Sequence, residues 1–489
     1  MVMKRILACL LTGCILLGLM TALQINPDLL PEDNILVDRN PDAVDQQALY
    51  DELFDLHSTV QIDVNLSRAE IAKLQEDYMA YKAIGSKSPI YRRAVSVTFT
   101  INGKKYVVED VGIRLKGNTT RSNFYNDVLG IYNLVHFKLH FGQTFEERSY
   151  YSVDAENWLD EDARQARLNR TFATLQKMEL KWNSNGDNTY VRTTYMNDMF
   201  RDYNIPAQRC VLADLRLGGC RVGIYRLFEP IDETFLSRYL PPEDFGGDLY
   251  KVRFISYSPA NYTLANSYGI DSKNNNIYHN FDLKTNRDTS QHESLRRLLE
   301  VINQPGVTRE ELEEVVDIDW LARYNAINFA AGNQDDLRFN YNNHYLYLRK
   351  SDGKAIFLPY DCEVCLGDTY SWNPSGDALT GMSPYEDTSF RTGVQDNPLE
   401  RQVVLEDGMF VDLYTRYLRD VCDSKWLTEE HFRTYYDAVA PHYADRVLPS
   451  YSYMSTLHMD TSFTMDACNG NMPVGEFMEK KKESVVVSD

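Results

Sequence analysis

Residues 332–361 read GNQDDLRFNYNNHYLYLRKSDGKAIFLPYD and contain the features from which the rest of this chain is best understood. Two apolar, aromatic-rich runs flank the turn Ser351-Asp352-Gly353, a pattern that predicts a β-hairpin. Asp335 lies in the loop before the hairpin, after a predicted helix that Gly332 ends, and Asp361 closes the second strand. The sequence therefore predicts two carboxylates at the two ends of one hairpin, both held by rigid elements.

The order of these groups is that of phosphoryl transfer on a kinase scaffold. There one carboxylate orients the attacking hydroxyl, while an Asn and a second carboxylate hold divalent metal. Asn340 follows Asp335 by five residues, the offset between the catalytic Asp and the metal-binding Asn of protein kinases. Asp and Asn also favour turns for purely structural reasons, so both interpretations stay open at this point.

Composition narrows the class of protein. The chain has 489 residues, which predicts two or three domains, and 43% hydrophobic residues with 33 tyrosines indicate a globular protein. A net charge of −20 without a long basic block argues against a nucleic-acid partner. Motifs of zinc proteases and serine hydrolases are missing from the sequence, whereas a sugar hydrolase with paired carboxylates stays open.

The N-terminus predicts export. Residues 1–5 are basic and residues 6–23 are apolar, so residues 1–24 are predicted to be a signal peptide or a membrane anchor. The sequence Leu11-Thr12-Gly13-Cys14 matches a lipobox, although the residues after Cys14 stay apolar, so a lipoprotein is the second reading. Residues 25–46 are predicted to be a linker, and the remaining chain is expected outside the cytosol, with no other membrane contact.

The body of the chain divides into a β-rich part and a helical part. The predicted α+β fold has a β-rich N-terminal lobe at 47–230, a mainly helical C-terminal lobe at 231–465 that contains the hairpin, and a flexible tail at 466–489. The predicted strands are at 95–101, 106–115, 133–141, 210–217 and 220–228. The predicted helices are at 190–203, 233–240, 291–303, 309–316, 319–331, 408–422, 428–440 and 441–453.

The hairpin at 210–228 also bears on disulfides. Its turn, Gly218-Gly219, predicts that Cys220 faces Leu217 and that Cys210 faces Leu227. These two cysteines are therefore not expected to pair with each other.

Four residues of the β-rich part are candidate nucleotide contacts. Lys138 is centred on the polar face of the strand at 133–141, and Arg114 and Lys116 precede a Gly-Asn-Thr-Thr loop whose amides suit an anion. Glu229 ends the second hairpin, where the two lobes meet. Each also has a structural interpretation. Lys138 could lie on a solvated face of the sheet, Arg114 and Lys116 could flank an ordinary turn, and Glu229 could be a structural anchor.

Beyond these patterns, the chain resembles the CotH family of secreted atypical protein kinases from about residue 60 to residue 440. The resemblance is carried, in order, by Val111 to Asn118, Gly223 to Glu229, Leu249-Tyr250-Lys251, Asn333-Gln334-Asp335, Asn343 to Tyr347, and Leu358 to Glu363. It implies a divergent kinase-like two-lobed fold that uses ATP with Mg²⁺ or Mn²⁺ to phosphorylate Ser or Thr of exported proteins.

The resemblance also implies roles for single residues. Asp335 resembles the catalytic Asp, with Asp336 as the alternative, and Asp361 resembles the metal-binding Asp. Asn343 competes with Asn340 for the metal-linked role. Lys138 becomes the first candidate phosphate contact, ahead of Arg114 and Lys116. The family commonly has Trp and Asp where this chain has Tyr360 and Glu363, and Glu363 can still bind Mg²⁺.

Two other functions fit parts of the sequence. A non-catalytic scaffold of the cell surface or spore coat could use the same fold for binding. The aromatic-rich loop from Tyr370 to Tyr385 would suit a carbohydrate-active surface protein.

Overall fold

The computed structural model describes most of the chain between residues 34 and 486. The described residues are 34–37, 44–84, 87–117, 121–126, 131–146, 160–184, 186–252, 260–264, 280–369, 379–387, 397–405, 407–447 and 472–486. The N-terminal segment 1–33 and most of the loop at 370–385 lie outside them. Within the described residues, no helix has the length and apolarity needed to cross a membrane.

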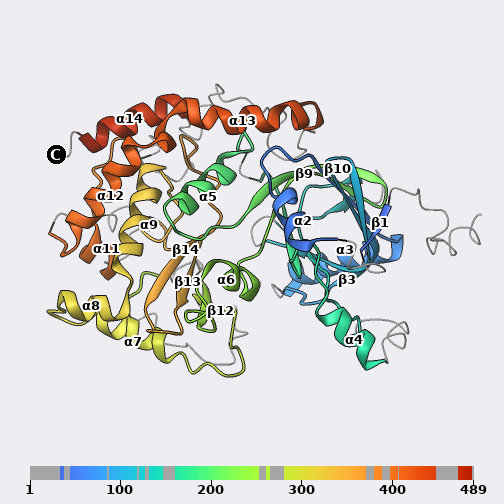
Figure 1. Ribbon diagram of the computed structural model, residues 1–489, viewed down its shortest axis with the longest axis horizontal. Helices are drawn as coiled ribbons and strands as arrows, with labels where there is room; N and C mark the ends of the chain where they lie inside the picture. Colours follow the sequence, from blue (N-terminus) through green and yellow to red (C-terminus); the bar gives the residue numbers. More distant parts are fainter. Residues whose placement is uncertain are drawn as a thin grey trace, which may run out of the picture.

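The first half is a mixed sheet that closes into a ring, drawn in blue to green in Figure 1. Its hydrogen-bonded order is β4-β3-β2-β9-β10-β8-β7, and β7 pairs back onto β4, while β1 pairs with β4 outside the ring. Closure removes the exposed sheet edges at which strands otherwise aggregate. The strands are β1 (Asn34–Leu36), β2 (Val60–Asn65), β3 (Arg92–Ile101), β4 (Lys104–Lys116), β7 (His136–His140), β8 (Lys177–Trp182), β9 (Cys210–Leu217) and β10 (Cys220–Phe228).

The alternating pattern of the strands fills this ring with apolar side chains. Phe137 and Leu139 of β7 are fully buried in its core, as are Met178 and Leu180 of β8, while Phe99 and Phe172 stack with ring centroids 4.2 Å apart. Short elements surround the ring: α2 (Gln46–Leu53), α3 (Arg68–Ile84), β5 (Tyr125–Asn126), β6 (Ile131–Tyr132) and α4 (Glu161–Leu168).

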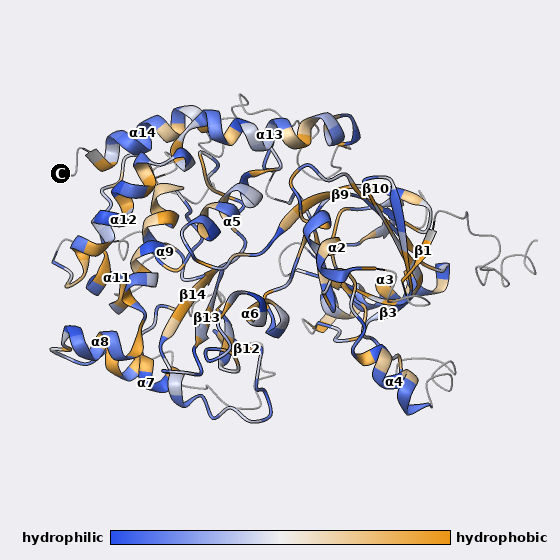
Figure 2. Ribbon diagram, in the orientation of Figure 1, coloured by the Kyte–Doolittle hydropathy of each residue, from blue (hydrophilic) through white to orange (hydrophobic). Residues whose placement is uncertain are grey.

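The second half combines a four-stranded antiparallel sheet with helices. The sheet order is β12-β11-β13-β14, with the strands β11 (Asp248–Val252), β12 (Phe281–Leu283), β13 (His344–Leu348) and β14 (Ala355–Pro359). Figure 2 shows the apolar character of β14 in the middle of this half. The helices are α6 (Glu233–Tyr239), α7 (Glu293–Ile302), α8 (Arg309–Val315), α9 (Ile318–Ala330), α11 (Pro398–Val403), α12 (Val411–Asp423), α13 (Glu429–Tyr443) and α14 (Val474–Val486), with 3₁₀ turns at Lys425–Leu427 and Ala444–Arg446.

The α+β class, the β-rich first half and the helical second half agree with the prediction, and so do the hairpins around Asn102-Gly103 and at 344–359. In the hairpin at 210–228, Cys220 faces Leu217 as predicted, but Cys210 faces Phe228, because a bulge shifts the register between Arg221 and Gly223. Among the described cysteines, both Cys210 and Cys220 are free.

The predicted boundary at residue 230 does not separate the two cores. Helix α5 (Arg192–Asp202) precedes β9 in sequence but packs into the core of the helical half. Its Tyr195 lies edge-on to Trp426 and Phe432, with ring centroids 4.9 and 5.0 Å away. The chain therefore enters the helical half once before it completes the ring.

The C-terminal region differs from the prediction in two places. Pro441 does not begin a new helix at 441–453, since it lies inside α13, near its end. The predicted flexible tail contains α14, in which Val474, Phe477 and Met478 are buried. The buried Lys481 ammonium donates to the Leu379 carbonyl (2.8 Å) and lies 3.4 Å from the centroid of the Phe329 ring, which explains how a lysine-rich segment packs on a core.

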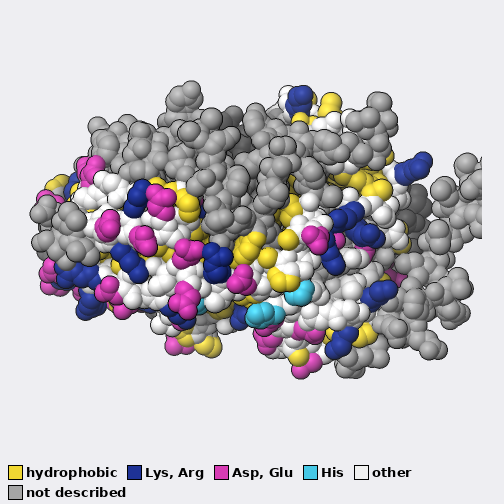
Figure 3. All heavy atoms as spheres, turned by 90° about the horizontal axis from the view of Figure 1, so that it is seen from above, with side chains coloured by type: hydrophobic (Ala, Val, Ile, Leu, Met, Phe, Trp, Pro, Cys, Tyr) yellow, Lys and Arg dark blue, Asp and Glu magenta, His cyan; other side chains and the backbone are white. Residues whose placement is uncertain are grey.

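The described surface of the helical half carries acidic and basic side chains side by side, as Figure 3 shows from above. Such a mixed surface is typical of a solvated face.

Helix α14 is expected to stabilise the fold. Phe477→Ala should lower the free energy of unfolding by about 3 kcal/mol or more, because a fully buried ring leaves a cavity. Glu479→Ala, at an exposed position of the same helix, is the matched control and should change it by less than about 0.5 kcal/mol. Urea denaturation measures both, and equal stabilities of the two variants would show that α14 does not pack as described.

Candidate active site

The loop after α9 holds Asp335 in one orientation. Gly332 leaves the helix with φ of 66°, a conformation that glycine adopts without a Cβ penalty. The half-buried Asp335 carboxylate then accepts hydrogen bonds from three side-chain amides, those of Asn340 (2.6 Å), Asn342 (3.1 Å) and Asn343 (2.8 Å). The run of Asn residues that the sequence places after Asp335 thus serves to orient its carboxylate.

The neighbouring Asp336 points into the protein. Its carboxylate accepts from the backbone N–H groups of Arg338 (2.9 Å) and Phe339 (2.8 Å), and its side chain is 1% exposed. Burial raises the pKa of Asp336 to about 7, although these N–H donors oppose the shift. Asp336 closes the loop from inside, so the geometry favours Asp335 over Asp336 as the group that faces a substrate.

The hairpin brings the second carboxylate to the same end of the structure. β13 and β14 pair in a register that sets His344 opposite Pro359, and the Tyr360 N–H donates to the Asn343 carbonyl (3.2 Å). Asn343 therefore contacts Asp335 through its side chain and the residue before Asp361 through its backbone. The two acids lie at the same end of the hairpin, on either side of Asn343.

Asp361 has an unusual backbone and a buried partner. Its φ is 59°, uncommon for a residue other than glycine and frequent at functional sites. Its carboxylate forms an ion pair with the Lys181 ammonium at 2.6 Å. Burial alone would raise the pKa of Asp361, but the Lys181 charge outweighs it and holds that pKa well below its usual range.

A group of lysines surrounds this ion pair. Registers of the ring align Arg114 of β4 with Lys138 of β7, and Lys138 with Glu179 of β8. The Glu179 carboxylate forms an ion pair with Lys116 (2.6 Å) and accepts a hydrogen bond from Lys138 (3.4 Å). Burial lowers the pKa of Lys116 to about 8, even though Glu179 opposes the shift.

Tyr360 connects these lysines across the two halves. Lys116 Nζ donates to its hydroxyl (2.7 Å), and Lys181 and Lys251 lie 4.2 and 3.8 Å from the centroid of its ring. We define the lysine cluster as Lys116, Lys138, Lys181 and Lys251, which come from β4, β7, β8 and β11. Lys116, Lys138 and Lys181 lie beside two carboxylates, Glu179 and Asp361, and Lys251 adds a fourth amino group, so basic groups outnumber acidic ones. Such an excess fits a polyphosphate.

The other predicted nucleotide contacts have protein partners. Although Arg114 is opposite Lys138 in the sheet, its guanidinium lies over the Tyr91 ring (4.7 Å) and donates to the Pro89 carbonyl, both outside the lysine cluster. Glu229 is fully buried and accepts from Arg238, from the Arg209 N–H and from two tyrosine hydroxyls, Tyr50 and Tyr239. These bonds fit the anchoring role that its sequence position also allowed, and the nucleotide contact of Glu229 stays a prediction.

The predicted metal ligands fit an ion that arrives with phosphates. Among the described residues, no three or more His, Cys, Asp or Glu side chains are grouped to hold a metal. Mg²⁺ in kinases needs only one or two carboxylates, and phosphates and water complete its shell. Asp335 and Asp361 can supply the carboxylates, and Asn340 and Asn343 keep an amide oxygen. The predicted ligand Glu363 pairs with the buried Arg226, which also donates to Asn183 and Thr193, and its role as a metal ligand stays a prediction.

Sequence comparison identifies the family. The profile described as CotH kinase protein matches residues 137–463, more than half of the chain. The chain belongs to the CotH kinase family. The match begins within β7, after Arg114 and Lys116 of β4, and includes the Asp335 loop and Asp361.

Comparison with solved structures adds a distant likeness. The crystal structure of the Helicobacter pylori proinflammatory kinase CtkA resembles the chain with a TM-score of 0.24 and 10% identity, covering 55% of this chain and 87% of that chain. No curated protein matches the sequence. Membership of the CotH kinase family therefore rests on the sequence profile.

Four groups of this CotH kinase site were not predicted from its sequence: Lys181, Glu179, Lys251 and the ring of Tyr360. The signal for the first two was present, because Lys177-Met178-Glu179-Leu180-Lys181 alternates charged and apolar residues with the period of a strand. Convergence with Tyr360 depends on contacts between distant segments, which the alternation does not encode.

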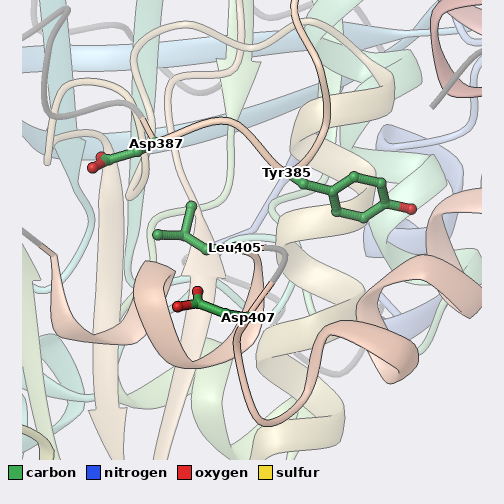
Figure 4. Close-up of a pocket in the computed structure, with 4 residues that line it drawn as sticks. All are labelled: Tyr385, Asp387, Leu405 and Asp407. Atoms are coloured by element: carbon green, nitrogen blue, oxygen red, sulfur yellow. The ribbon is translucent and has the colours of Figure 1, made fainter.

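A cavity of about 360 Å³ lies apart from these groups in the helical half. Figure 4 shows its lining, Tyr385, Asp387, Leu405 and Asp407. None of the predicted site residues lines it. Arg338, from the Asp335 loop, donates to the carbonyl of Glu386, which lies between two of the lining residues.

The adjacent acids should respond differently to the same substitution. Asp335→Asn should reduce phosphoryl transfer by about a hundredfold or more. Asp336→Asn should keep it, because the Asp336 side chain is buried inside the loop and, with a native pKa of about 7, is already about half protonated at neutrality. In the wild type, the unfolded chain releases this proton near pH 4 and the native state only near pH 7, so stability falls as pH rises through that window. The side chain introduced by Asp336→Asn has no such proton to release. The difference in free energy of unfolding between this variant and wild type should therefore shift in favour of the variant from pH 5 to pH 8.

Thermal melting across that pH range, together with a transfer assay, tests both statements. A pH-independent stability difference would contradict the described burial of Asp336. Loss of transfer in Asp336→Asn with transfer retained in Asp335→Asn would reverse the assignment of the two acids.

Glu229 is expected to act on stability. Glu229→Ala should lower the free energy of unfolding by about 3 kcal/mol or more, because it leaves the Arg238 charge without its buried partner. Glu243→Ala, at an exposed position, is the control. The ATP affinity of the folded fraction should be unchanged. A variant that stays as stable as wild type but has lost ATP affinity would show that Glu229 contacts the nucleotide.

Proposed function

We propose that this CotH kinase family member transfers the γ-phosphoryl group of ATP to Ser or Thr hydroxyls of exported proteins. The observation that carries the proposal is the Asn343 bridge, which sets Asp335 and Asp361 at one end of the hairpin, with Asp361 paired to the lysine cluster. A carboxylate base, a second acid and an excess of ammonium groups are what phosphoryl transfer requires of a protein.

Asp335 is proposed to accept the proton of the attacking hydroxyl. Its three amide donors fix the carboxylate in one direction before substrate arrives, which reduces the reorganisation needed for the reaction. Lys116 and Lys138 are proposed to bind phosphate oxygens, since Glu179 holds both ammonium groups on one face of the ring.

Mg²⁺ or Mn²⁺ is proposed to enter with the nucleotide. Asp361 would hold the ion with Asn343 or Asn340, and the ion would supply neutralisation of the phosphate charge. Lys181 contacts only one oxygen of Asp361, Oδ1, so the second oxygen stays available to the ion.

The compartment and the partners follow from the N-terminal segment. Its basic start and apolar run support export as a secreted or membrane-anchored protein, with a lipoprotein as the second form. Exported proteins are therefore the proposed substrates, the membrane contact is restricted to the N-terminal segment, and the acidic net charge argues against nucleic acid.

The wild-type chain should incorporate phosphate from labelled ATP into a Ser-rich exported protein, in the presence of Mg²⁺ or Mn²⁺. Asp335→Asn and Asp361→Asn should each reduce the rate by about a hundredfold or more. Asp352→Asn, at the exposed turn of the same hairpin, is the matched control and should leave it unchanged. Phosphate transfer that persists in both Asp335→Asn and Asp361→Asn would contradict the kinase assignment.

One observation favours a non-catalytic scaffold as the second candidate. Asp361 and Glu363 each have a buried cationic partner, Lys181 and Arg226, so both acids are satisfied within the protein. The scaffold predicts no change in melting temperature with ATP and Mn²⁺, whereas the kinase predicts a rise, since a ligand that binds only the folded state stabilises it.

A further inference from the structure

Lys251 differs from the other members of the lysine cluster in its partners. Lys116 and Lys138 share Glu179, and Lys181 pairs with Asp361. Among the described residues, no carboxylate lies within 4.0 Å of the Lys251 ammonium. Its recorded contacts are aromatic, with the ring centroids of Tyr360 at 3.8 Å and Tyr345 at 5.8 Å.

The strand neighbours of Lys251 do not supply the missing anion. β11 sets Lys251 opposite Tyr345 on one side and Asp282 on the other. The Asp282 carboxylate is taken by Lys284 at 2.5 Å and approached by Arg287 at 4.0 Å. A partly buried ammonium therefore stacks on a ring at the centre of the cluster, while the nearest acid in register serves other cations.

We propose that Lys251 binds a phosphate oxygen of the nucleotide, and that the Tyr360 ring holds its ammonium at that position. This rests on the proposed function and extends it, because it adds a phosphate contact from the helical half to those of the ring. Lys116 reaches the hydroxyl of Tyr360 and Lys251 its face, so one side chain positions cations from both halves.

The electrostatics of the site support the same role. Burial, and then the neighbouring Lys116 charge, hold the pKa of Lys251 well below its usual range. The charged form of Lys251 is therefore disfavoured until an anion arrives, and an incoming polyanion stabilises it more than it stabilises a lysine that already has a carboxylate partner. A purely structural cation–π contact would not depend on whether a phosphate is present, so the two roles can be separated by experiment.

Binding of adenosine, ATP and inorganic tripolyphosphate to the full chain separates them. Lys251→Met should lower the affinity for ATP and for tripolyphosphate by about ten- to a hundredfold. Its affinity for adenosine should stay within about twofold of wild type. Lys251→Arg keeps the charge and should stay within about threefold of wild type for all three ligands. Lys350→Met, at an exposed position of the turn between β13 and β14, is the matched control and should bind all three ligands as wild type does. Lys251→Gln replaces Lys251→Met if the latter does not fold.

Equal losses of adenosine and ATP, or no loss of either, would overturn the role of Lys251. The proposed function fails separately. If wild type binds tripolyphosphate in a Lys251-dependent way but transfers no phosphate, the phosphate contact stands and the kinase assignment falls. If wild type transfers phosphate and Lys251→Met binds ATP as well as wild type does, the kinase assignment stands and the phosphate contact of Lys251 falls. If wild type binds neither ATP nor tripolyphosphate, both fail.

Discussion

The ion pair between Lys181 and Asp361 is the constraint around which the site is built. It joins β8 of the ring to the end of the hairpin in the helical half, with 2.6 Å between the charged atoms and with Lys181 nearly inaccessible to solvent. Removing two charges from water costs several kcal/mol per ion, so a buried pair contributes little net stability relative to apolar residues. We infer that the ion pair serves to position Asp361, whose backbone is in the left-handed region, beside the lysine cluster.

The closed ring explains how Lys116, Lys138 and Lys181, three members of the lysine cluster, come to one place. Because β7 pairs with both β4 and β8, alternate residues of three adjacent strands share one face, and their apolar neighbours fill the core of the ring. On a free barrel this charged face would be solvated. Here the hairpin and β11 of the helical half cover it, and the Tyr360 ring occupies the middle. The contact between the halves thus turns an ordinary outer face of a sheet into a partly dehydrated site, where electrostatic interactions are stronger than in water.

Local patterns predicted much of this arrangement, and contacts between distant segments account for the rest. The hairpin at 344–359, the helix that ends at Ala330 and the loop position of Asp335 follow from turn residues and periodicity, which act over a few residues. Lys138 was identified because strand alternation is local too. The roles of Lys181 and Lys251 depend on which surfaces meet, and no local rule encodes that. Helix α14 escaped prediction for a related reason, since its lysine-rich sequence is typical of a solvated tail, and only the core beneath it shows that Lys481 is buried.

The two departures from the common family pattern are each matched by a partner elsewhere in the chain. A tryptophan at position 360 could donate through its indole but could not accept, whereas the Tyr360 hydroxyl accepts from Lys116. Glu363, longer by one methylene than the usual Asp, reaches the buried Arg226 of β10. Each substitution therefore adds a bond from the hairpin to the ring. Tyr360 and Glu363, which depart from the common family pattern, thus form contacts between the two halves. The phosphate site that we propose lies beside the Tyr360 contact.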